Sequence, residues 1–470
     1  MTAPLVRAIA NVTAFVGEDF EPRVVDLRIA EDGTIESIEG APSVERPSGD
    51  RAANESAMND GAIDEGAMDQ GTFEIDGTGL FAFPGMIDCH DHFRNITPGL
   101  SLAQGLRLDE FLQVLWSTGA EMGPTEYKIG ALLGSLQRLK TGVTTVVDHC
   151  YTFHAPGLDE ASIEGYQGSG VRWLYARGIM TRPYEPVCEP WETAEATVRR
   201  LVDDGLVPPE RLFVAPVSIR QATPEDFRRS RALADDLGVG TYTHVAETAS
   251  ELDTWKAEAG DTPIRALDAF GFLTERTVLI HCVLVDDGEI ELLRARGSHV
   301  VHCPTNHMKL AKGFTRVPDL LAAGVNVAMG VDMMADMMVE MRAEIGMHAA
   351  NRLDPSAVST LDAFRIATRN GARAIGWGDR TGIIEEGRLA DLVVLDGRSL
   401  LQAPLLDPRY ALLYATDPGM VRHVLVEGRL VVRDGRSELV DEEALLAEAE
   451  SVTDAYLARI GFPGGTWFSR

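Results

Sequence analysis

Two histidines, His90 and His92, stand one residue apart directly after the apolar segment 81–87. In an extended chain, side chains at positions i and i+2 point to the same side, so both imidazoles face one point in space. Two neutral imidazoles that converge at a strand end provide half of a zinc or iron site. The alternative is a pair of solvated or core histidines, and the remainder of the chain must supply further ligands to exclude it.

Three further residues that bind metals or move protons stand at the ends of other apolar segments. They are His244, His281 and Asp332. A lone buried histidine is usually a core residue whose polar atoms are satisfied by neighbours. That interpretation explains poorly why four histidines and an aspartate all fall at the same kind of position.

The elements that must position these residues are short apolar strands that alternate with helical patterns. Helix-like spacers such as 132–139 and 225–237 separate the strands. Eight strands with intervening helices predict an α/β fold of the (β/α)8 TIM-like barrel type, in which catalytic groups lie at the carboxyl ends of the strands. A doubly wound open sheet is the alternative, but no Gly-x-Gly-x-x-Gly follows any strand. The expected strands are 81–87, 141–148, 171–175, 212–217, 239–244, 277–281, 298–302 and 325–332.

The two ends of the chain predict a small β domain built from both termini. Alternating segments occur at 24–29 and 34–38, and strand-like segments return at 390–395 and 423–432, before an amphipathic helix at 442–460. We therefore expect residues 1–80 to form the N-terminal part of a β-sandwich, with an acidic loop insertion at 41–75. Residues 81–380 are expected to form the barrel, and residues 381–470 the C-terminal part of the sandwich with a closing helix.

Composition excludes several classes of partner. The net charge of −29 over 470 residues argues against nucleic acid and anionic membrane. No run of about 18 apolar residues occurs, and the first residues do not form a secretory signal. Five cysteines without a Cys-x-x-Cys pair fit reduced thiols, so a cytoplasmic protein is expected.

At this point the chain resembles the amidohydrolase superfamily. Residues 84–92 (Pro-Gly-Met-Ile-Asp-Cys-His-Asp-His) are similar to its first-strand signature, and 243–248 and 280–282 are similar to its fifth- and sixth-strand motifs. Residues 382–392 resemble the return into its β-sandwich domain. The pair His244-x-x-Glu247 and residues 144–149 look most like the atrazine chlorohydrolase and aminohydrolase group, which includes deaminases of guanine, 8-oxoguanine and S-adenosylhomocysteine.

The resemblance implies roles for named residues. His90, His92, His244 and Asp332 would hold one divalent metal, Zn²⁺ or Fe²⁺, which lowers the pKa of a bound water. The fourth strand and the residues after it (212–220) contain no lysine, which favours a single ion over two. Glu247 would shuttle a proton, His281 would steady the charge on the attacking oxygen, and Asp332 would also accept a hydrogen bond from the water. The competing interpretation of Glu247 is a solvated carboxylate at a helix start.

Two loops depart from the family pattern, so the particular substrate does not transfer. They are residues 304–310 and the methionine-rich 333–338, which is either an adaptable apolar wall or core. Candidate substrate-binding residues are Arg94, His149, His154 and His307.

The function these residues predict is hydrolysis of a C–N bond in an aminated N-heterocycle such as a purine, pyrimidine or s-triazine. The alternatives are dechlorination, N-dealkylation or cyclic amide hydrolysis at the same site, or a non-catalytic binding protein. The expected partners are a small heterocycle and, since relatives are often dimers, a second copy of the chain.

Overall fold

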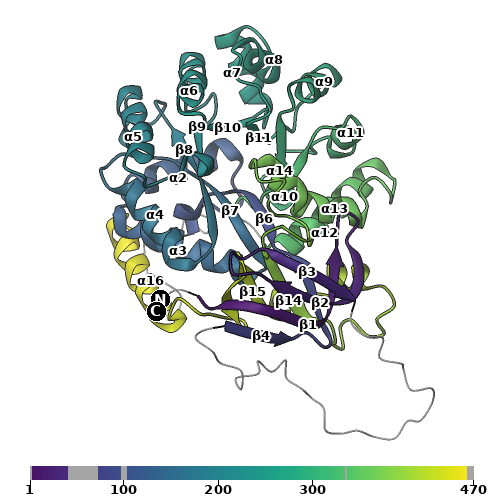
Figure 1. Ribbon diagram of the computed structural model, residues 1–470. Coiled ribbons are helices and arrows are strands. Elements are labelled where there is room, and N and C mark those ends of the chain that lie inside the picture. The colour runs from purple at the N-terminus through teal and green to yellow at the C-terminus, as the bar shows by residue number, and fades with distance from the viewer. Residues whose placement is uncertain (1–2, 41–71, 97–102, 334–335, 463–470) are drawn as a thin grey trace, which may run out of the picture.

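The computed structural model describes residues 3–40, 72–96, 103–333 and 336–462. Within them the chain forms a barrel and a mixed sheet that lies beside it (Figure 1). Most of the expected acidic loop, residues 41–71, falls outside the described residues. Its last residues are a correction, because Thr72–Asp76 form strand β4 in parallel with β1 (Leu5–Val16). Phe73 and Ile75 alternate with polar residues there, and Ile75 is buried.

Each of the eight expected segments contributes a strand to the barrel, and these strands are parallel and in sequence order. The first and eighth strands are joined where the Asp332 N–H donates to the His90 carbonyl over 2.9 Å. The predicted (β/α)8 fold is thus confirmed as a nearly closed barrel. The strands are β6 (Met86–Asp91), β7 (Val143–Cys150), β8 (Arg172–Ile179), β9 (Leu212–Pro216), β10 (Gly240–Val245), β11 (Thr277–His281), β12 (His299–His302) and β13 (Val327–Met329).

The expected first strand at 81–87 is wrong as a single element. Leu80–Pro84 form β5 of the mixed sheet, and only from Met86 does the chain enter the barrel as β6. Gly85 separates them, and a Cβ at this position would lie 2.2 Å from the Thr144 hydroxyl oxygen. Its N–H donates to the Asp391 carbonyl over 2.8 Å. Apolar content alone cannot distinguish two short strands of different sheets from one continuous strand.

The mixed sheet contains strands from both ends of the chain, as expected. Its order is β17-β16-β15-β14-β5-β1-β2-β3, and an extra pairing of β16 with β1 bends the sheet back on itself around its own core. The expected strand at 423–432 is a hairpin, because Glu427 and Gly428 both have positive φ, as a tight two-residue turn requires. The other strands of this sheet are β2 (Glu21–Ile29), β3 (Ile35–Gly40), β14 (Leu392–Asp396), β15 (Val421–Val426), β16 (Arg429–Arg433) and β17 (Arg436–Ser437).

Helices surround the barrel, and their ends carry conventional sequence signals. In the helix 224–237, Thr223 caps the first turn, Pro224 occupies the first helical position, and Gly238 ends the helix in the left-handed conformation. The helices are α2 (Leu108–Gly119), α3 (Pro124–Lys140), α4 (Leu158–Ser169), α5 (Trp191–Asp203), α6 (Pro224–Leu237), α7 (Ala249–Ala259), α8 (Pro263–Ala269), α9 (Asp287–Arg296), α10 (Pro304–Lys309), α11 (Val317–Ala322), α12 (Met337–Arg352), α13 (Thr360–Ala367), α14 (Arg369–Ala374), α15 (Pro408–Tyr414) and α16 (Glu442–Arg459).

A buried ion pair connects the barrel to the mixed sheet. The Arg172 guanidinium of β8 donates through both terminal nitrogens to Asp391, which directly precedes β14. It also contacts Glu427 over 3.0 Å, and Asp391 accepts a further hydrogen bond from the Thr381 hydroxyl over 2.6 Å. The two parts are therefore held together by polar as well as apolar contacts.

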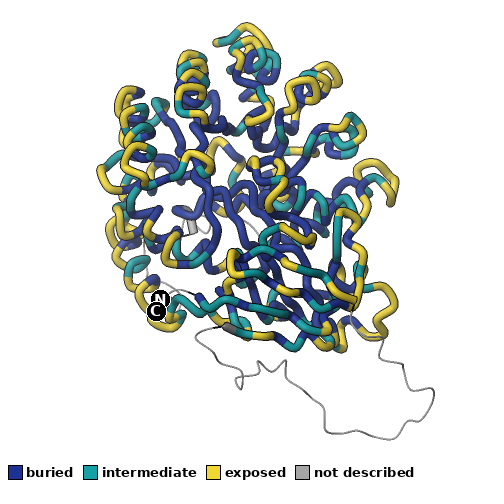
Figure 2. Tube along the Cα trace, in the orientation of Figure 1, coloured by how far each residue is buried: buried dark blue, intermediate teal, exposed yellow. Residues whose placement is uncertain are grey.

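Buried residues are concentrated in the strands and on the inner helix faces (Figure 2).

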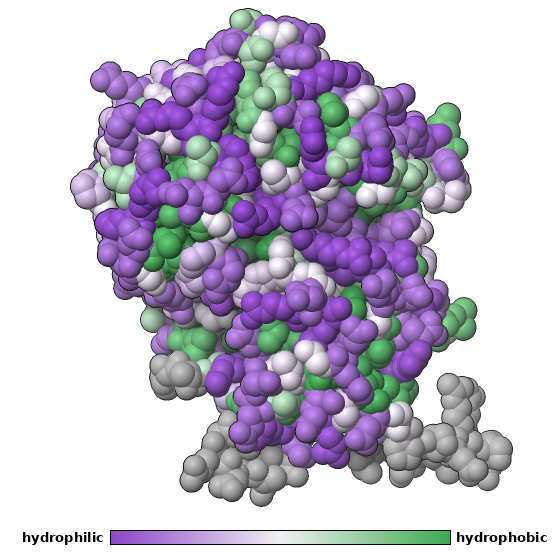
Figure 3. Space-filling view, turned by 45° about the horizontal axis from the view of Figure 1, so that its top comes forward, coloured by the Kyte–Doolittle hydropathy of each residue, from purple (hydrophilic) through white to green (hydrophobic). Residues whose placement is uncertain are grey.

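The visible surface in Figure 3 is predominantly hydrophilic, with apolar residues scattered among polar ones. This agrees with the acid-rich composition. No helix of the described residues is long and apolar enough to cross a membrane.

Candidate active site at the carboxyl end of the barrel

Three imidazoles and one carboxylate converge at the carboxyl ends of strands β6, β10 and β13. The His244 Nε2 atom lies 3.2 Å from Nε2 of His90 and 3.3 Å from Nε2 of His92. Asp332 Oδ1 lies 3.5 Å from His90 Nε2 and 3.7 Å from His92 Nε2. Separations of this size are those of ligands about 2.1 Å from one shared cation. The four residues expected to hold a metal are thus brought together.

Each imidazole turns its other nitrogen toward a fixed partner. Nδ1 of His90 lies 2.7 Å from the Tyr242 hydroxyl, that of His92 is 2.7 Å from the His149 carbonyl, and that of His244 is 2.8 Å from the Val217 carbonyl. Carbonyl oxygens can only accept, so His92 and His244 carry their proton on Nδ1 and leave Nε2 free as a ligand. The donor set therefore fits a divalent zinc or iron ion.

Burial keeps these imidazoles neutral. Removal from water, followed by the neighbouring His281, lowers the pKa of His244 to about 4. Burial likewise lowers the pKa of His90, helped by His244 and His281, and the pKa of His92, helped by His90, well below the usual range. Neutral imidazole is the form that binds a metal, so no proton needs to be displaced at neutral pH.

Two aspartates of the first strand hold the loop that carries Asp332. Asp88 accepts the Val331 N–H over 3.0 Å, and Asp91 accepts the Met333 N–H over 3.1 Å. Both carboxylates are paired with Arg138 of α3. Asp332 has a φ of +51° and Met333 a φ of +72°, which residues other than glycine rarely adopt. These contacts stabilise the backbone conformation that directs Asp332 toward the histidines.

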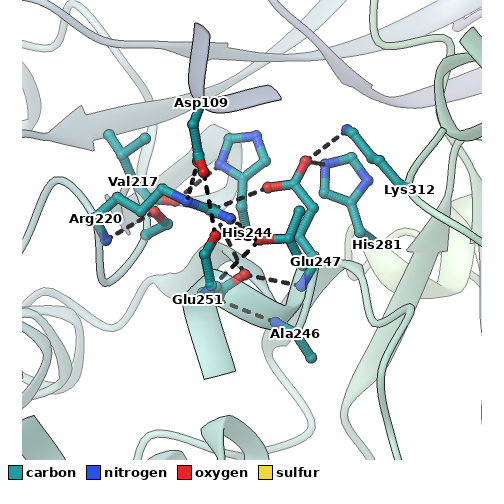
Figure 4. A network of polar contacts seen from close by, with 12 residues as sticks. Asp109, Val217, Arg220, His244, Ala246, Glu247, Glu251, His281 and Lys312 are labelled. Carbon is teal, nitrogen blue, oxygen red and sulfur yellow. Dashed lines mark hydrogen bonds and ion pairs between the residues drawn. The ribbon is translucent and has the colours of Figure 1, made fainter. Parts of the chain in front are cut away.

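Glu247 lies between two cations and His281, as Figure 4 shows. Its Oε1 atom is 2.5 Å from Lys312 Nζ and 3.1 Å from His281 Nε2, and its Oε2 atom is 3.1 Å from Arg220 Nη1. Burial raises the pKa of Glu247, but Lys312 and then His281 outweigh it, so the pKa is held well below its usual range. Glu247 is 4% exposed, which excludes the interpretation as a solvated carboxylate.

Glu251 of α7 supports Glu247 from beneath. It accepts the backbone N–H groups of Ala246 over 3.1 Å and Glu247 over 2.8 Å, and it lies 3.6 Å from Arg220. Asp109 of α2 contacts the same guanidinium at 3.5 Å. Arg220 therefore has three carboxylate neighbours and remains charged.

His281 has a left-handed backbone conformation, which contacts with its neighbours must stabilise. Its φ is +77°, and its carbonyl accepts a hydrogen bond from the Thr315 hydroxyl over 2.8 Å. Its Nε2 faces Glu247, and Asp332 Oδ2 lies 3.8 Å away. On the other side, His281 Nδ1 is 3.0 Å from Nε2 of His307.

A cavity opens beside these groups at the carboxyl end of the barrel. Its polar end contains His92, His244 and Asp332 together with Glu247 and Lys312. One apolar wall is the inner face of α2, and Tyr151, Val217, Leu310 and Met333 extend it. The α2 residues that line the cavity are Leu108, Phe111, Leu112 and Leu115.

The four candidate substrate-binding residues lie around the site rather than on the lining of this cavity. Arg94 is buried with its guanidinium 4.2 Å from the Tyr151 ring centre, and His149 packs its ring 4.7 Å from that of His244. His154 borders a separate surface depression, and His307 contacts His281. Of the methionine-rich segment, Met333 lines the cavity, whereas Met337 and Met338 are buried in the core.

Sequence reasoning missed Lys312, Arg220 and helix α2. Lysine occurs at only five positions, and Lys312 follows a loop already marked as unusual, so its rarity was an available signal. Arg220 stands just after the fourth strand, in a segment whose residues give no sign that they face Glu247. The apolar face of α2 carries no signal for its location, because an amphipathic pattern does not say which surface it covers.

Comparison with known proteins agrees with this geometry. Residues 81–431 match the model of the Amidohydrolase family. A 5'-deoxyadenosine deaminase of Methanopyrus kandleri is 33% identical over 375 residues, which span 77% of this chain and 84% of that protein. A 5-methylthioadenosine/S-adenosylhomocysteine deaminase of Natronomonas pharaonis is 35% identical over 392 residues, spanning 80% of this chain and 87% of that protein.

A solved structure extends the likeness to the fold. An adenosine deaminase from Xanthomonas campestris with bound zinc aligns with a TM-score of 0.82 at 26% identity, covering 98% of this chain and 100% of that one. The chain therefore belongs to the amidohydrolase family, as its motifs predict. It is a deaminase, a hydrolase that acts on carbon–nitrogen bonds other than peptide bonds.

Proposed function

We propose that this protein removes ammonia hydrolytically from the purine of an adenosine derivative modified at its 5' position. The observation that carries the proposal is the position of the Glu247 carboxylate, beside His281 and at the edge of the three-imidazole, one-aspartate cluster. Such a group is placed to carry a proton between water and a ring nitrogen. The deaminase relatives at 33% and 35% identity support a purine nucleoside as the heterocycle.

One divalent ion per chain, zinc or iron, belongs to this proposal. His90, His92, His244 and Asp332 would hold it, and when bound it would lower the pKa of a water so that hydroxide is available near neutral pH. The fourth strand ends without a lysine, which supports a single ion. The zinc in the structurally similar adenosine deaminase favours zinc.

The residues of the chain then perform the proton transfers. Glu247 accepts a proton from the attacking water and delivers it to the ring nitrogen next to the amino-bearing carbon, while the new carbon–oxygen bond forms and the C=N bond becomes single. The remaining hydroxyl proton passes to the amino group. The carbon–nitrogen bond then breaks, ammonia leaves, and the carbonyl forms. His281 donates a hydrogen bond to the oxygen as it is added.

The cavity suits a substrate with one polar and one apolar end. The heterocycle faces Glu247 and Lys312, and the substituent faces the leucines and Phe111 of α2. A deoxy or methylthio group at the 5' position loses little on burial against such a wall, whereas a free hydroxyl would need a hydrogen-bond partner there. This favours 5'-modified nucleosides over adenosine itself.

A panel assay tests the proposal. The zinc- and iron-loaded protein is incubated with 5'-deoxyadenosine, 5'-methylthioadenosine, S-adenosylhomocysteine, adenosine, guanine, melamine and a chlorotriazine. Ammonia, alkylamine and chloride are measured separately. We expect ammonia release, fastest from the 5'-modified adenosines. Chloride or alkylamine without ammonia would move the assignment to dechlorination or N-dealkylation, and no turnover with metal bound would favour a binding protein.

The proposal includes a homodimer with one site in each chain. Light scattering on the same preparation measures the mass in solution, and a mass near the 51.0 kDa of one chain would contradict the dimer.

A further inference from the structure

His307 is a buried histidine whose ring contacts that of His281. It lies on α10, is 1% exposed, and does not line the cavity. Its Nε2 atom is 3.0 Å from Nδ1 of His281, on the opposite side of the His281 ring from Glu247. A single proton must lie between two ring nitrogens at this distance, and its position decides what His281 can do.

The contacts of Glu247 determine where the protons are. Oε1 lies beside Lys312 and Oε2 beside Arg220, and neither cation can accept a hydrogen bond. Glu247 is therefore a carboxylate that only accepts. Its contact of 3.1 Å with His281 Nε2 requires the proton to be on that nitrogen. A neutral His281 then has a bare Nδ1, and His307 must donate to it from Nε2.

The second nitrogen of His307 is consistent with this assignment. Its Nδ1 is 3.5 Å from the Thr315 hydroxyl, and that hydroxyl already donates its proton to the His281 carbonyl over 2.8 Å. No proton is available from Thr315, and the contact is too long to demand one. Nδ1 of His307 can therefore be bare, which leaves its single proton on Nε2.

A buried cluster packs against His307 and restricts its ring. The His302 ring stands at 66° to it with centres 4.8 Å apart. Nδ1 of His302 is 2.5 Å from Glu344, a carboxylate of α12, which lies 3.1 Å from His348 on the same helix. All three side chains are fully buried, so the ring against which His307 rests is itself fixed by a hydrogen bond.

We propose that His307 is a positioning residue, which holds His281 in the tautomer with its proton on Nε2 and fixes the plane of its ring. This inference rests on the proposed function for its effect on rate, but the tautomer itself does not depend on the substrate. In this tautomer His281 presents an N–H to the oxygen added to the substrate. In the other tautomer it would present a lone pair, and the stabilisation of the developing charge would be lost.

Two variants of His307 distinguish a role in orienting His281 from a role in filling space. His307→Gln keeps an amide N–H that can donate to His281, whereas His307→Leu fills similar volume without a donor. We expect His307→Leu to lower kcat about 10–100-fold with little change in KM, and His307→Gln to remain within about tenfold of wild type. Both variants should keep the zinc content of the wild type, because His307 is not among the four ligands.

Nitrogen-15 NMR of the zinc-loaded, histidine-labelled protein reads the tautomer directly, with the His281 signals assigned by their absence in His281→Asn. We expect wild type and His307→Gln to show a proton on His281 Nε2, and His307→Leu to populate the Nδ1–H form. A wild-type proton on Nδ1, or a His307→Leu variant with unchanged tautomer and kcat, would overturn the inference. If the nucleoside panel fails but the tautomer pattern holds, the proposed function is wrong while the positioning role of His307 stands.

Discussion

Replacing Glu247 by glutamine removes one negative charge without changing the shape of the side chain. The wild-type carboxylate accepts from three donors, namely Lys312 and His281 at Oε1 and Arg220 at Oε2. Glutamine has one acceptor oxygen. With that oxygen toward Lys312 and His281, its NH2 group faces the Arg220 guanidinium, and two donors oppose each other.

The expected losses of stability and of kcat follow from the contacts that Glu247→Gln retains. Arg220 keeps Glu251 and Asp109, so the fold should lose one charge-assisted hydrogen bond, about 1.5–3 kcal/mol in the free energy of unfolding. An amide cannot carry the proton at all, so kcat should fall about 10²–10⁴-fold, which is about 2.7–5.5 kcal/mol in the activation barrier. The zinc content should not change, because no ligand is removed.

The assay measures ammonia release at saturating 5'-deoxyadenosine, with zinc analysis and urea unfolding on the same samples. Asp109→Asn is the matched control, since it removes a carboxylate from the same arginine. Its side chain is 65% exposed and 3.5 Å from Arg220, so kcat should stay within about twofold of wild type.

A Glu247→Gln variant that retains more than a tenth of the wild-type kcat would show that another group carries the proton. Loss of zinc from this variant would instead show that the charge of Glu247 is needed to hold the metal. A large loss in Asp109→Asn would mean that Arg220 acts in the reaction and does not merely neutralise Glu247.

Three further predictions concern the metal, the pH dependence and the contact between the two parts of the chain. His244→Ala should lower the zinc content from about one ion per chain to near zero with unchanged far-UV circular dichroism, whereas His154→Ala, outside the cluster, should leave it unchanged. In the metal-free protein, the folded pKa of His244 is about 4 against an ordinary 6.5, so between these values the unfolded chain binds more protons. The free energy of unfolding should therefore fall as the pH drops through that window, and less steeply in His244→Asn; denaturant titrations from pH 7 to 4 measure it. Asp391→Ala leaves the buried Arg172 with Glu427 as its one remaining carboxylate partner among the described residues and should cost about 3–5 kcal/mol in urea unfolding, while Glu291→Ala, in the exposed pair with Arg294, should change little.

The barrel and the convergence of His90, His92, His244 and Asp332 could be predicted because local patterns determine them. Each barrel strand is a short apolar run, and a histidine or aspartate at its end reaches the same rim whatever the helices do. The confirmed fold depends on this redundancy, since each of the eight strands is indicated by its own segment of the sequence. The hairpin at Glu427 and Gly428 was not foreseen because its first turn residue is not the asparagine or aspartate typical of such turns.

The contacts of Glu247 could not be predicted, because its partners lie far from it in the sequence. Lys312, Arg220 and Asp109 come from three separate loops and helices, and no local period relates them to Glu247. Their partners are set by how the βα loops fold over the rim. The orientation of His307 away from the cavity could not be predicted either, because the residue type at a loop position does not specify which neighbour its side chain contacts.

The single-residue connection at Gly85 bears on how a substrate reaches the site. A hinge between two parts of a protein needs residues that can absorb a change of φ and ψ. Here β5 is paired on both sides within the mixed sheet, β6 is fixed in the barrel, and Gly85 between them touches Thr144 and is bonded to Asp391. This connection therefore provides no hinge between the two parts, and a substrate reaches the cavity through the rim of the barrel. The small-angle scattering curve should accordingly superimpose with and without ligand, while hydrogen exchange slows only in the segments that line the cavity.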